Sequence, residues 1–160
     1  MPPTFSLRIT PEQQEHQEVL DFEYKLEMWI QEEGYRQFAI SNVVIGREYE
    51  LNHHFHLVFD SFDFNVKTIK DAFRDTIYKE FGVSKAHQGN PFWSMAEVRD
   101  KDKAYQYAIK DGVYNILNAI NEFQFKEYVT EMYKKSKKKP KSLKSLMDGL
   151  YSSFEKNEIT

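Results

Sequence analysis

Segments with the hydrophobic period of a β-strand alternate along this chain of 160 residues with segments that have the period of an α-helix, and the order of these segments limits the folds that the chain can adopt. Segments in which polar and apolar residues alternate are typical of strands, whereas apolar residues at every third or fourth position indicate helices. Turn and capping residues mark the boundaries between the two kinds of segment. The patterns predict strands at 4–10, 36–46, 53–60 and 91–98, and helices at 11–34, 65–82, 100–110 and 114–135.

The first predicted helix has recognisable boundary residues. Thr10 suits an N-cap, Pro11 suits the first helical position, and Gln13 completes a capping box. Gly34 is the expected C-cap. The apolar stripe between these ends consists of Leu20, Phe22, Tyr24, Leu26, Trp29 and Ile30.

The order of the elements predicts the fold class. The second and third strands follow each other closely, which favours a hairpin. Hairpins and helices laid on one sheet predict an α+β domain with an antiparallel central sheet flanked by helices. A lysine-rich break and a short helix beyond residue 135 would add a helical C-terminal tail.

Composition excludes several classes of protein. The chain has no cysteine, so disulfides, thiolate zinc sites and cysteine nucleophiles are ruled out. No apolar run approaches the roughly 20 residues that span a bilayer, so no membrane partner is expected. The net charge of −3 conceals an asymmetry, because residues 134–144 hold seven basic residues and no acid. The remainder is strongly acidic, which argues against a protein that coats nucleic acid over its whole surface.

The segment His54-Phe55-His56 lies within the third predicted strand. Residues two apart on a strand share a face, so both imidazoles point the same way and His53 points the other way. Imidazole is a good ligand for divalent transition metals. Glu48 falls about opposite His53 and His54 across the hairpin and would complete a three-ligand site with open positions. The alternative is a plain hairpin with structural histidines and a solvated loop glutamate.

A second group lies on the helix predicted at 100–110. Tyr107 and Lys110 are three residues apart and therefore share one face of that helix. Tyrosine is a possible nucleophile, but with a pKa near 10 it needs a neighbouring cation or a metal-polarised phosphate. About one Tyr-x-x-Lys is expected by chance in this composition. Tyr105 and Tyr107 are equally compatible with a role in the core.

Three segments in this order resemble the motifs of the HUH-superfamily replication-initiator (Rep) endonucleases of circular single-stranded DNA viruses. They are the apolar strand Phe5-Ser6-Leu7-Arg8-Ile9-Thr10, the strand His54-Phe55-His56-Leu57-Val58-Phe59, and Tyr107-Ala108-Ile109-Lys110-Asp111-Gly112. Gly46-Arg47-Glu48, Trp93 and Val98-Arg99-Asp100 occupy the places of further family features, and the resemblance covers about residues 4–112. Many circular-virus Reps carry glutamine where this chain has His56, and the usual Ala-Arg-Gly turn is altered.

The resemblance implies an HUH/RRM-like Rep nuclease fold with an endonuclease core at 1–112, a helical extension at 113–135, and a lysine-rich linker with a short helix at 136–160. It implies a metal-dependent, sequence-specific single-stranded DNA nickase and ligase that initiates rolling-circle replication through a covalent 5′-phosphotyrosine. Tyr107 would attack, and Lys110 would position the phosphate or assist proton transfer. Glu48, His54 and His56 would hold Mg²⁺ or Mn²⁺, and Arg8, Arg47, Arg99 and Lys103 would contact DNA.

The expected partners are single-stranded or stem-loop origin DNA and the host replication machinery. No phosphate-binding loop of the Walker type is present, so the helicase that usually follows the Rep nuclease is expected in a longer protein. Localisation would be the host nucleus for a eukaryotic virus and otherwise the cytoplasm. The lysine-rich segment fits a nuclear-localisation signal, a DNA clamp or a linker equally well. Three alternatives are a transposase or relaxase of the same superfamily, a non-catalytic origin-binding module, and a metal-dependent hydrolase that uses activated water.

Overall fold

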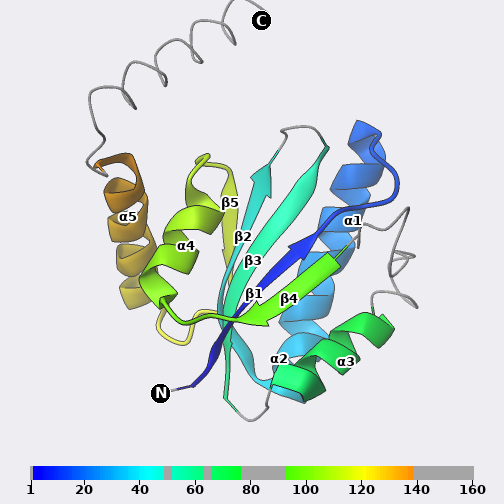
Figure 1. Ribbon diagram of the computed structural model, residues 1–160, viewed down its shortest axis with the longest axis horizontal. Helices are drawn as coiled ribbons and strands as arrows, with labels where there is room; N and C mark the ends of the chain where they lie inside the picture. Colours follow the sequence, from blue (N-terminus) through cyan, green and yellow to red (C-terminus); the bar gives the residue numbers. More distant parts are fainter. Residues whose placement is uncertain (1, 49–51, 63–65, 77–92, 139–160) are drawn as a thin grey trace, which may run out of the picture.

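The computed structural model describes residues 2–48, 52–62, 66–76 and 93–138 (Figure 1). It is an α+β structure built on a five-stranded antiparallel sheet with strand order β4-β1-β3-β2-β5. The strands are β1 Thr4–Ile9, β2 Ile40–Glu48, β3 His54–Ser61, β4 Trp93–Glu97 and β5 Tyr114–Leu117. The helices are α1 His16–Trp29, a π-helical turn at Ile30–Gly34, α2 Tyr35–Phe38, α3 Val66–Thr76, α4 Lys101–Ile109 and α5 Glu122–Lys138. The predicted fold class is therefore confirmed.

Helices cover both faces of the sheet, with α1, α2 and α3 on one side and α4 and α5 on the other (Figure 1). Alternation along β3 serves both layers: Phe55, Leu57 and Phe59 belong to the core under α1, α2 and α3, whereas Val58 belongs to the core under α4 and α5. Each of these side chains is at most 2% exposed. Complete burial of a large apolar side chain contributes about 1.5–3 kcal/mol, so both helical layers are firmly attached to the sheet.

The boundaries predicted for the first helix are wrong at both ends. The helix begins at His16, because Gln14 is engaged elsewhere: its amide nitrogen donates to the carbonyl oxygens of Pro11 and His53, and its amide oxygen accepts from the backbone N–H of His53. These bonds hold the segment before α1 in a non-helical connection to the start of β3. At the other end the chain stays helical through Gly34 and turns only at Ala39, which has a φ of 50°.

The helix predicted to begin at Tyr114 is also wrong at its start. Tyr114–Leu117 forms β5 and pairs with β2 at the edge of the sheet. The strand ends at Asn118, whose φ is 52° and whose side chain donates to two backbone carbonyl oxygens at 3.0 Å. The side chain of Asn121 then accepts from the backbone N–H of Gln124 at 3.0 Å, and α5 follows.

The strand predicted at 36–46 is wrong at its start, because residues 36–38 belong to α2 and β2 begins only after the turn at Ala39 and continues to Glu48. The other predicted elements agree with the structure where it describes them. β1, β3, β4 and α4 lie within the predicted ranges or one residue beyond them, and Asp100 caps α4 through the backbone N–H of Lys103. Ile69 and Phe73 of α3 are buried, whereas the rest of the helix predicted at 65–82 and the predicted C-terminal helix lie outside the described residues. Among the described helices, none is long and apolar enough to cross a membrane.

Candidate metal centre

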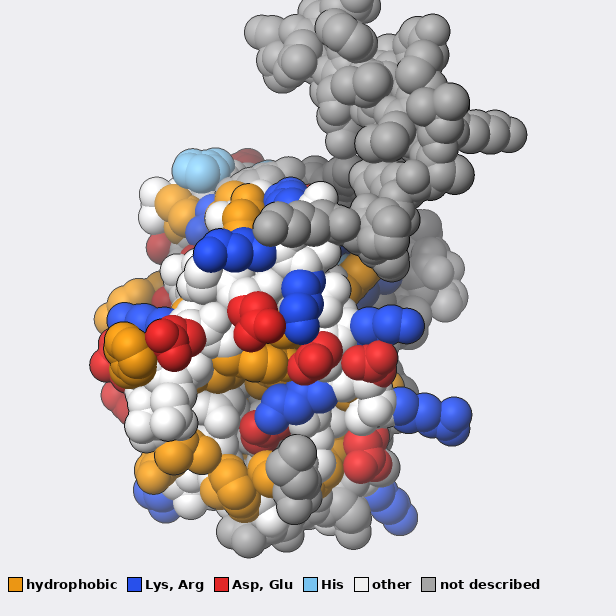
Figure 2. Space-filling model, turned by 90° about the vertical axis from the view of Figure 1, so that its left-hand side faces the viewer, with side chains coloured by type: hydrophobic (Ala, Val, Ile, Leu, Met, Phe, Trp, Pro, Cys, Tyr) orange, Lys and Arg blue, Asp and Glu red, His pale blue; other side chains and the backbone are white. Residues whose placement is uncertain are grey.

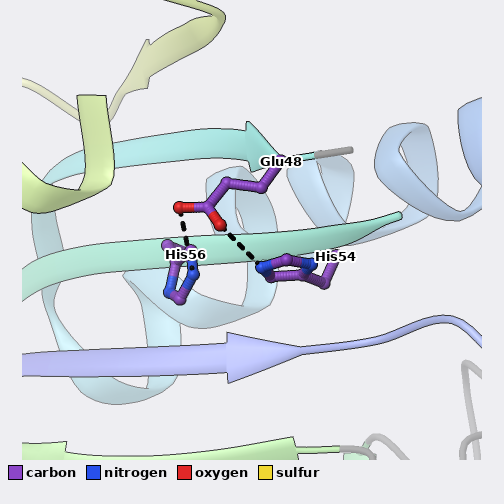
Figure 3. A group of neighbouring side chains, drawn as sticks. All are labelled: Glu48, His54 and His56. Carbon is purple, nitrogen blue, oxygen red and sulfur yellow. Dashed lines mark hydrogen bonds and ion pairs between the residues drawn. The ribbon is translucent and has the colours of Figure 1, made fainter. Parts of the chain in front are cut away.

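Three potential metal ligands meet where β2 ends and β3 begins. Glu48 is the direct cross-strand partner of His54, and Gly46 is the partner of His56. Because alternate residues of a strand share a face, all three side chains project from the side of the sheet that carries α4. The carboxylate of Glu48 extends over β3 and faces both imidazoles (Figure 3). The predicted hairpin register is therefore present in the structure.

The distances within this group are short enough for one ion. The Nε2 atom of His54 lies 2.9 Å from Oε2 of Glu48, and Nε2 of His56 lies 3.4 Å from Oε1. One ligand atom from each residue lies within 4.8 Å of those from the other two. Glu48 and His54 are buried, with 6% and 7% of their surface exposed. A buried carboxylate is costly unless a cation or hydrogen-bond donors compensate it.

The orientation of His54 shows how its ring would bind a cation. Its Nδ1 atom lies 2.8 Å from the carbonyl oxygen of Asn52, which can only accept a hydrogen bond, so we assign the proton to Nδ1. In the neutral ring, Nε2 then carries a lone pair that faces an oxygen of Glu48 2.9 Å away. Two acceptors at this distance need a proton or a metal ion between them. Metal-ligating histidines usually have this arrangement, with the second ring nitrogen bonded to a carbonyl or carboxylate.

The protonation states also suit a metal ligand set. Burial lowers the pKa of His56 to about 4; Glu48 opposes this effect, and His54, Lys110 and Arg8 reinforce it. The ring of His56 is therefore neutral at pH 7, the form that coordinates metal. Within the described residues its Nε2 is buried and makes no hydrogen bond. For Glu48, burial favours a higher pKa, but Lys110 and the two histidines together lower it, so the carboxylate is ionised.

The donor set of two imidazoles and one carboxylate fits Mn²⁺ well and Mg²⁺ less well, because Mg²⁺ prefers oxygen ligands. Three protein ligands leave coordination positions for water or for an oxygen of a substrate. The residues therefore fit a divalent ion whose remaining positions face the side of the sheet that carries α4.

Tyr107 and Lys110 of α4 lie beside this group. The ring centroid of Tyr107 is 5.0 Å from that of His56, with the two planes 82° apart. The Nζ atom of Lys110 is 3.0 Å from Oε1 of Glu48 and 4.0 Å from the centre of the Tyr107 ring. Tyr107 is 53% exposed, so it is not a core aromatic residue. Tyr105, by contrast, is fully buried and donates to the carbonyl oxygen of Asn42 at 2.5 Å.

Gly46 allows α4 to come this close to the sheet. A Cβ atom at this position would lie 1.7 Å from the carbonyl oxygen of Ala108 and 2.8 Å from its carbonyl carbon. Ala108 directly follows Tyr107, so contact between the α4 backbone and β2 fixes the height of Tyr107 above the sheet. The sequence held a signal for this contact, because an isolated glycine in an apolar strand often marks a close approach of another backbone.

A buried polar cluster fastens the other end of α4. Asp60 on β3, only 1% exposed, accepts from the hydroxyl of Thr4 at 2.6 Å and pairs with the ammonium of Lys101 at 3.1 Å. Lys101 is the first residue of α4, so this ion pair and the Tyr105–Asn42 hydrogen bond secure the first half of the helix. Asp60, Lys101 and Asn42 are not among the site residues predicted from the sequence.

An open groove of about 770 Å³ runs from the metal group along α4, above β1 and β4. Its floor includes the small side chains of Ser6, Ser94 and Ala96, and α4 contributes Lys103, Tyr107 and Lys110 to its lining. Arg8 also lines it, as the direct neighbour of His56 across β1 and β3. None of the described residues that line this groove is acidic.

The outer surface of the helices beside the groove differs from the groove in its charge. Acidic and basic side chains are interspersed on that side of the molecule (Figure 2). On α5 they form pairs one turn apart, Lys126 with Glu122 and Lys135 with Glu131. The excess of positive charge is therefore a property of the groove and not of the helical surface beside it.

The other residues predicted to contact DNA differ in their position relative to the groove. Lys103 is exposed and lies in the groove one helical turn before Tyr107. Arg99 is exposed in the turn before α4, at the opposite end of that helix from Tyr107. Arg47 precedes Glu48 and therefore projects from the other face of the sheet, where its guanidinium pairs with Glu23 of α1. The structure does not bring Arg47 into the groove.

His53 lies just before β3, and its backbone is bound by Gln14. Its side chain does not belong to the metal-ligand group.

Comparison of this chain with protein-family models, with curated proteins and with solved structures gave no match. The fold and the site thus define an α+β protein with a five-stranded antiparallel sheet and a buried His–Glu–His group that suits a divalent ion.

Proposed function

We propose that this chain is a metal-dependent endonuclease of the HUH type, which nicks and rejoins single-stranded DNA through a covalent 5′-phosphotyrosine. One observation carries the proposal: an exposed tyrosine with a lysine beside it lies against a buried two-histidine, one-carboxylate group. Tyr107 and His56 are 51 positions apart in sequence but have ring centroids 5.0 Å apart. Such a pairing of nucleophile, cation and potential Lewis-acid site matches the requirements of phosphoryl transfer.

The residues have distinct tasks in this proposal. The Oη atom of Tyr107 attacks the scissile phosphorus, the bond from phosphorus to the 3′ oxygen breaks, and the phenol loses its proton as the 3′ hydroxyl gains one. One phosphodiester replaces another, so the step is readily reversed and the strand can be rejoined. A divalent ion held by Glu48, His54 and His56 would supply polarisation of the scissile phosphate.

Lys110 supplies positive charge next to the nucleophile. Burial tends to lower the pKa of Lys110, but Glu48 and Tyr107 outweigh this effect and raise it, so the side chain is an ammonium at neutral pH. An ammonium 4.0 Å from the Tyr107 ring favours the negative charge that develops on the phenol oxygen or on the phosphate.

The groove supports a flexible polyanion as the substrate. It is lined by Arg8, Lys103 and Lys110 and lacks acidic residues among its described lining, in a chain whose net charge is −3. Its volume of about 770 Å³ is in the range of sites for small ligands, so it accommodates a short stretch of one strand rather than a duplex. Arg8 and Lys103 would bind the phosphates of that strand. Target sequence, helicase, host machinery and nuclear localisation stay predictions from the family resemblance.

A covalent adduct is the decisive test. The protein is incubated with Mn²⁺ and a pool of single-stranded oligonucleotides of random sequence, and adducts that survive denaturation are counted on a gel. We expect an adduct that chelator abolishes and that Tyr107→Phe does not form. Tyr35→Phe is the matched control, because Tyr35 is 60% exposed on α2, which covers the other face of the sheet.

The possible results separate the alternatives. An adduct formed by Tyr107→Phe would refute the assignment of the nucleophile. Cleavage without any adduct would identify a hydrolase that uses activated water. DNA binding that is indifferent to chelator and is never followed by cleavage would identify a non-catalytic binding module.

A further inference from the structure

The Glu48 carboxylate has two oxygens and three neighbours. His54 faces Oε2 at 2.9 Å, while both Lys110 and His56 approach Oε1, at 3.0 and 3.4 Å. His54 faces Oε2 and His56 faces Oε1, so an ion that binds both histidines would approach Oε1, the oxygen that Lys110 contacts, as well as Oε2. Two cations at one oxygen repel each other strongly when the surroundings are partly desolvated.

We propose that Lys110 and the metal ion compete for Oε1 of Glu48, so that metal binding releases the Lys110 ammonium from Glu48 and leaves it with Tyr107, its other neighbour. This inference rests on the proposed function and concerns the regulation of the same site. It makes Lys110 a link between the two halves of the site: the charge that assists the nucleophile is released when the ligand group is loaded.

The surroundings of Lys110 allow the side chain to move while its backbone stays in place. The carbonyl oxygen of Lys110 accepts a hydrogen bond from Nζ of Lys137 at 2.6 Å, which ties the end of α4 to α5. The side chain of Lys110 is 37% exposed, so its ammonium borders the groove and is not enclosed. Tyr107 lies one helical turn earlier on the same face, with its ring centre already 4.0 Å from Nζ. An ammonium released from Glu48 therefore still lies beside Tyr107.

Competition between Lys110 and the metal ion for Glu48 has a consequence that would not arise if Lys110 acted only in catalysis. Removal of the Lys110 charge should strengthen metal binding while it weakens the reaction. A lysine that merely supports the ligand group, by holding Glu48 in place, predicts the reverse, because its loss would disorder the carboxylate and weaken metal binding.

The test measures Mn²⁺ affinity without DNA, from the electron paramagnetic resonance signal of free Mn²⁺. We expect Lys110→Met to bind Mn²⁺ at least about fivefold more tightly than the wild type, which corresponds to loss of one partly exposed ion pair. Lys103→Met is the matched control: it removes the same charge from the same helix, but the ammonium of Lys103 lies 3.9 Å from Asp100 and not beside Glu48. Its affinity should stay within about twofold of the wild type. Lys110→Gln should behave like Lys110→Met, and circular dichroism shows whether both variants fold.

Each outcome decides a different point. Equal or weaker Mn²⁺ binding by both Lys110 variants would overturn the competition, even if the wild type forms the DNA adduct. Tighter binding by both variants without any adduct in the wild type would support the competition and refute the nickase. Absence of Mn²⁺ binding in every variant would overturn the metal centre itself.

Discussion

Replacement of Gly46 by alanine tests whether the contact between α4 and the sheet creates the site. The added Cβ would lie 1.7 Å from the carbonyl oxygen of Ala108, whereas real Cβ contacts are essentially never under 3.0 Å. Helix α4 would therefore have to move outward by more than about 1 Å, since this clash is with backbone and cannot be relieved by a rotamer change. Such overpacking costs about 1–3 kcal/mol of stability.

The displacement acts on one half of the site. Tyr107 and Lys110 move with α4, whereas Glu48, His54 and His56 stay on β2 and β3. A misplacement of about 1 Å can reduce a rate by 10²-fold. We therefore expect Gly46→Ala to form the DNA adduct about 100-fold more slowly at saturating Mn²⁺, to bind Mn²⁺ no more weakly than the wild type, and to unfold at a lower temperature.

Gly34→Ala is the matched control. Its Cβ would meet the side chains of Ile40 and Trp29 at 3.2 and 3.4 Å, so it also crowds a buried position but does not contact α4. It should not slow adduct formation, because the contact between α4 and β2 stays as it is. An adduct rate within about threefold of the wild type in folded Gly46→Ala would refute the reasoning, because 10²-fold is expected. Loss of Mn²⁺ binding would show that the substitution distorts β2 instead.

Three further predictions use other parts of the site. His54→Ala and His56→Ala should each abolish Mn²⁺ binding and the adduct, whereas His53→Ala should retain both, as measured by calorimetry and on gels. The pKa of His56 falls to about 4 in the folded protein, so the unfolded chain binds more protons between pH 6.5 and 4. Stability measured by urea unfolding should therefore decline as the pH falls through this window, and His56→Phe should flatten the decline. Arg8→Ala should weaken binding of single-stranded DNA and make the slope of log binding constant against log salt concentration shallower by about 0.7. Arg47→Ala should leave the affinity and the slope unchanged and lower the melting temperature.

Local sequence patterns were sufficient to predict which side chains form the metal-ligand group. The alternation of a strand placed His54 and His56 together, and a short hairpin placed Glu48 opposite them. The same alternation applies to β2, where Arg47 must project from the face opposite Glu48. Its pairing with Glu23 of α1 follows from that parity, which the sequence analysis did not apply to this residue.

Contacts between segments that are distant in the chain determine the elements that were wrongly predicted from the sequence. The sequence favoured a helix that begins at Pro11, and only the position of β3 shows that Gln14 instead binds the backbone of His53. Tyr114–Leu117 is compatible with a helix or a strand, and the open edge of β2 selects the strand. In both places tertiary hydrogen bonds outweigh weak local preferences.

The sequence by itself determined the α+β class, the shared face of the two histidines and the neighbouring positions of Tyr107 and Lys110 on one helix. These properties follow from the periods of strand and helix, which act over a few residues. Only the tertiary structure decided that α4 lies against β2 at Gly46, that Lys110 reaches Glu48, and that a groove without acidic residues in its described lining borders both. Those features depend on close packing between segments far apart in the chain, where a single missing Cβ sets the distance from the proposed nucleophile to the ligand group.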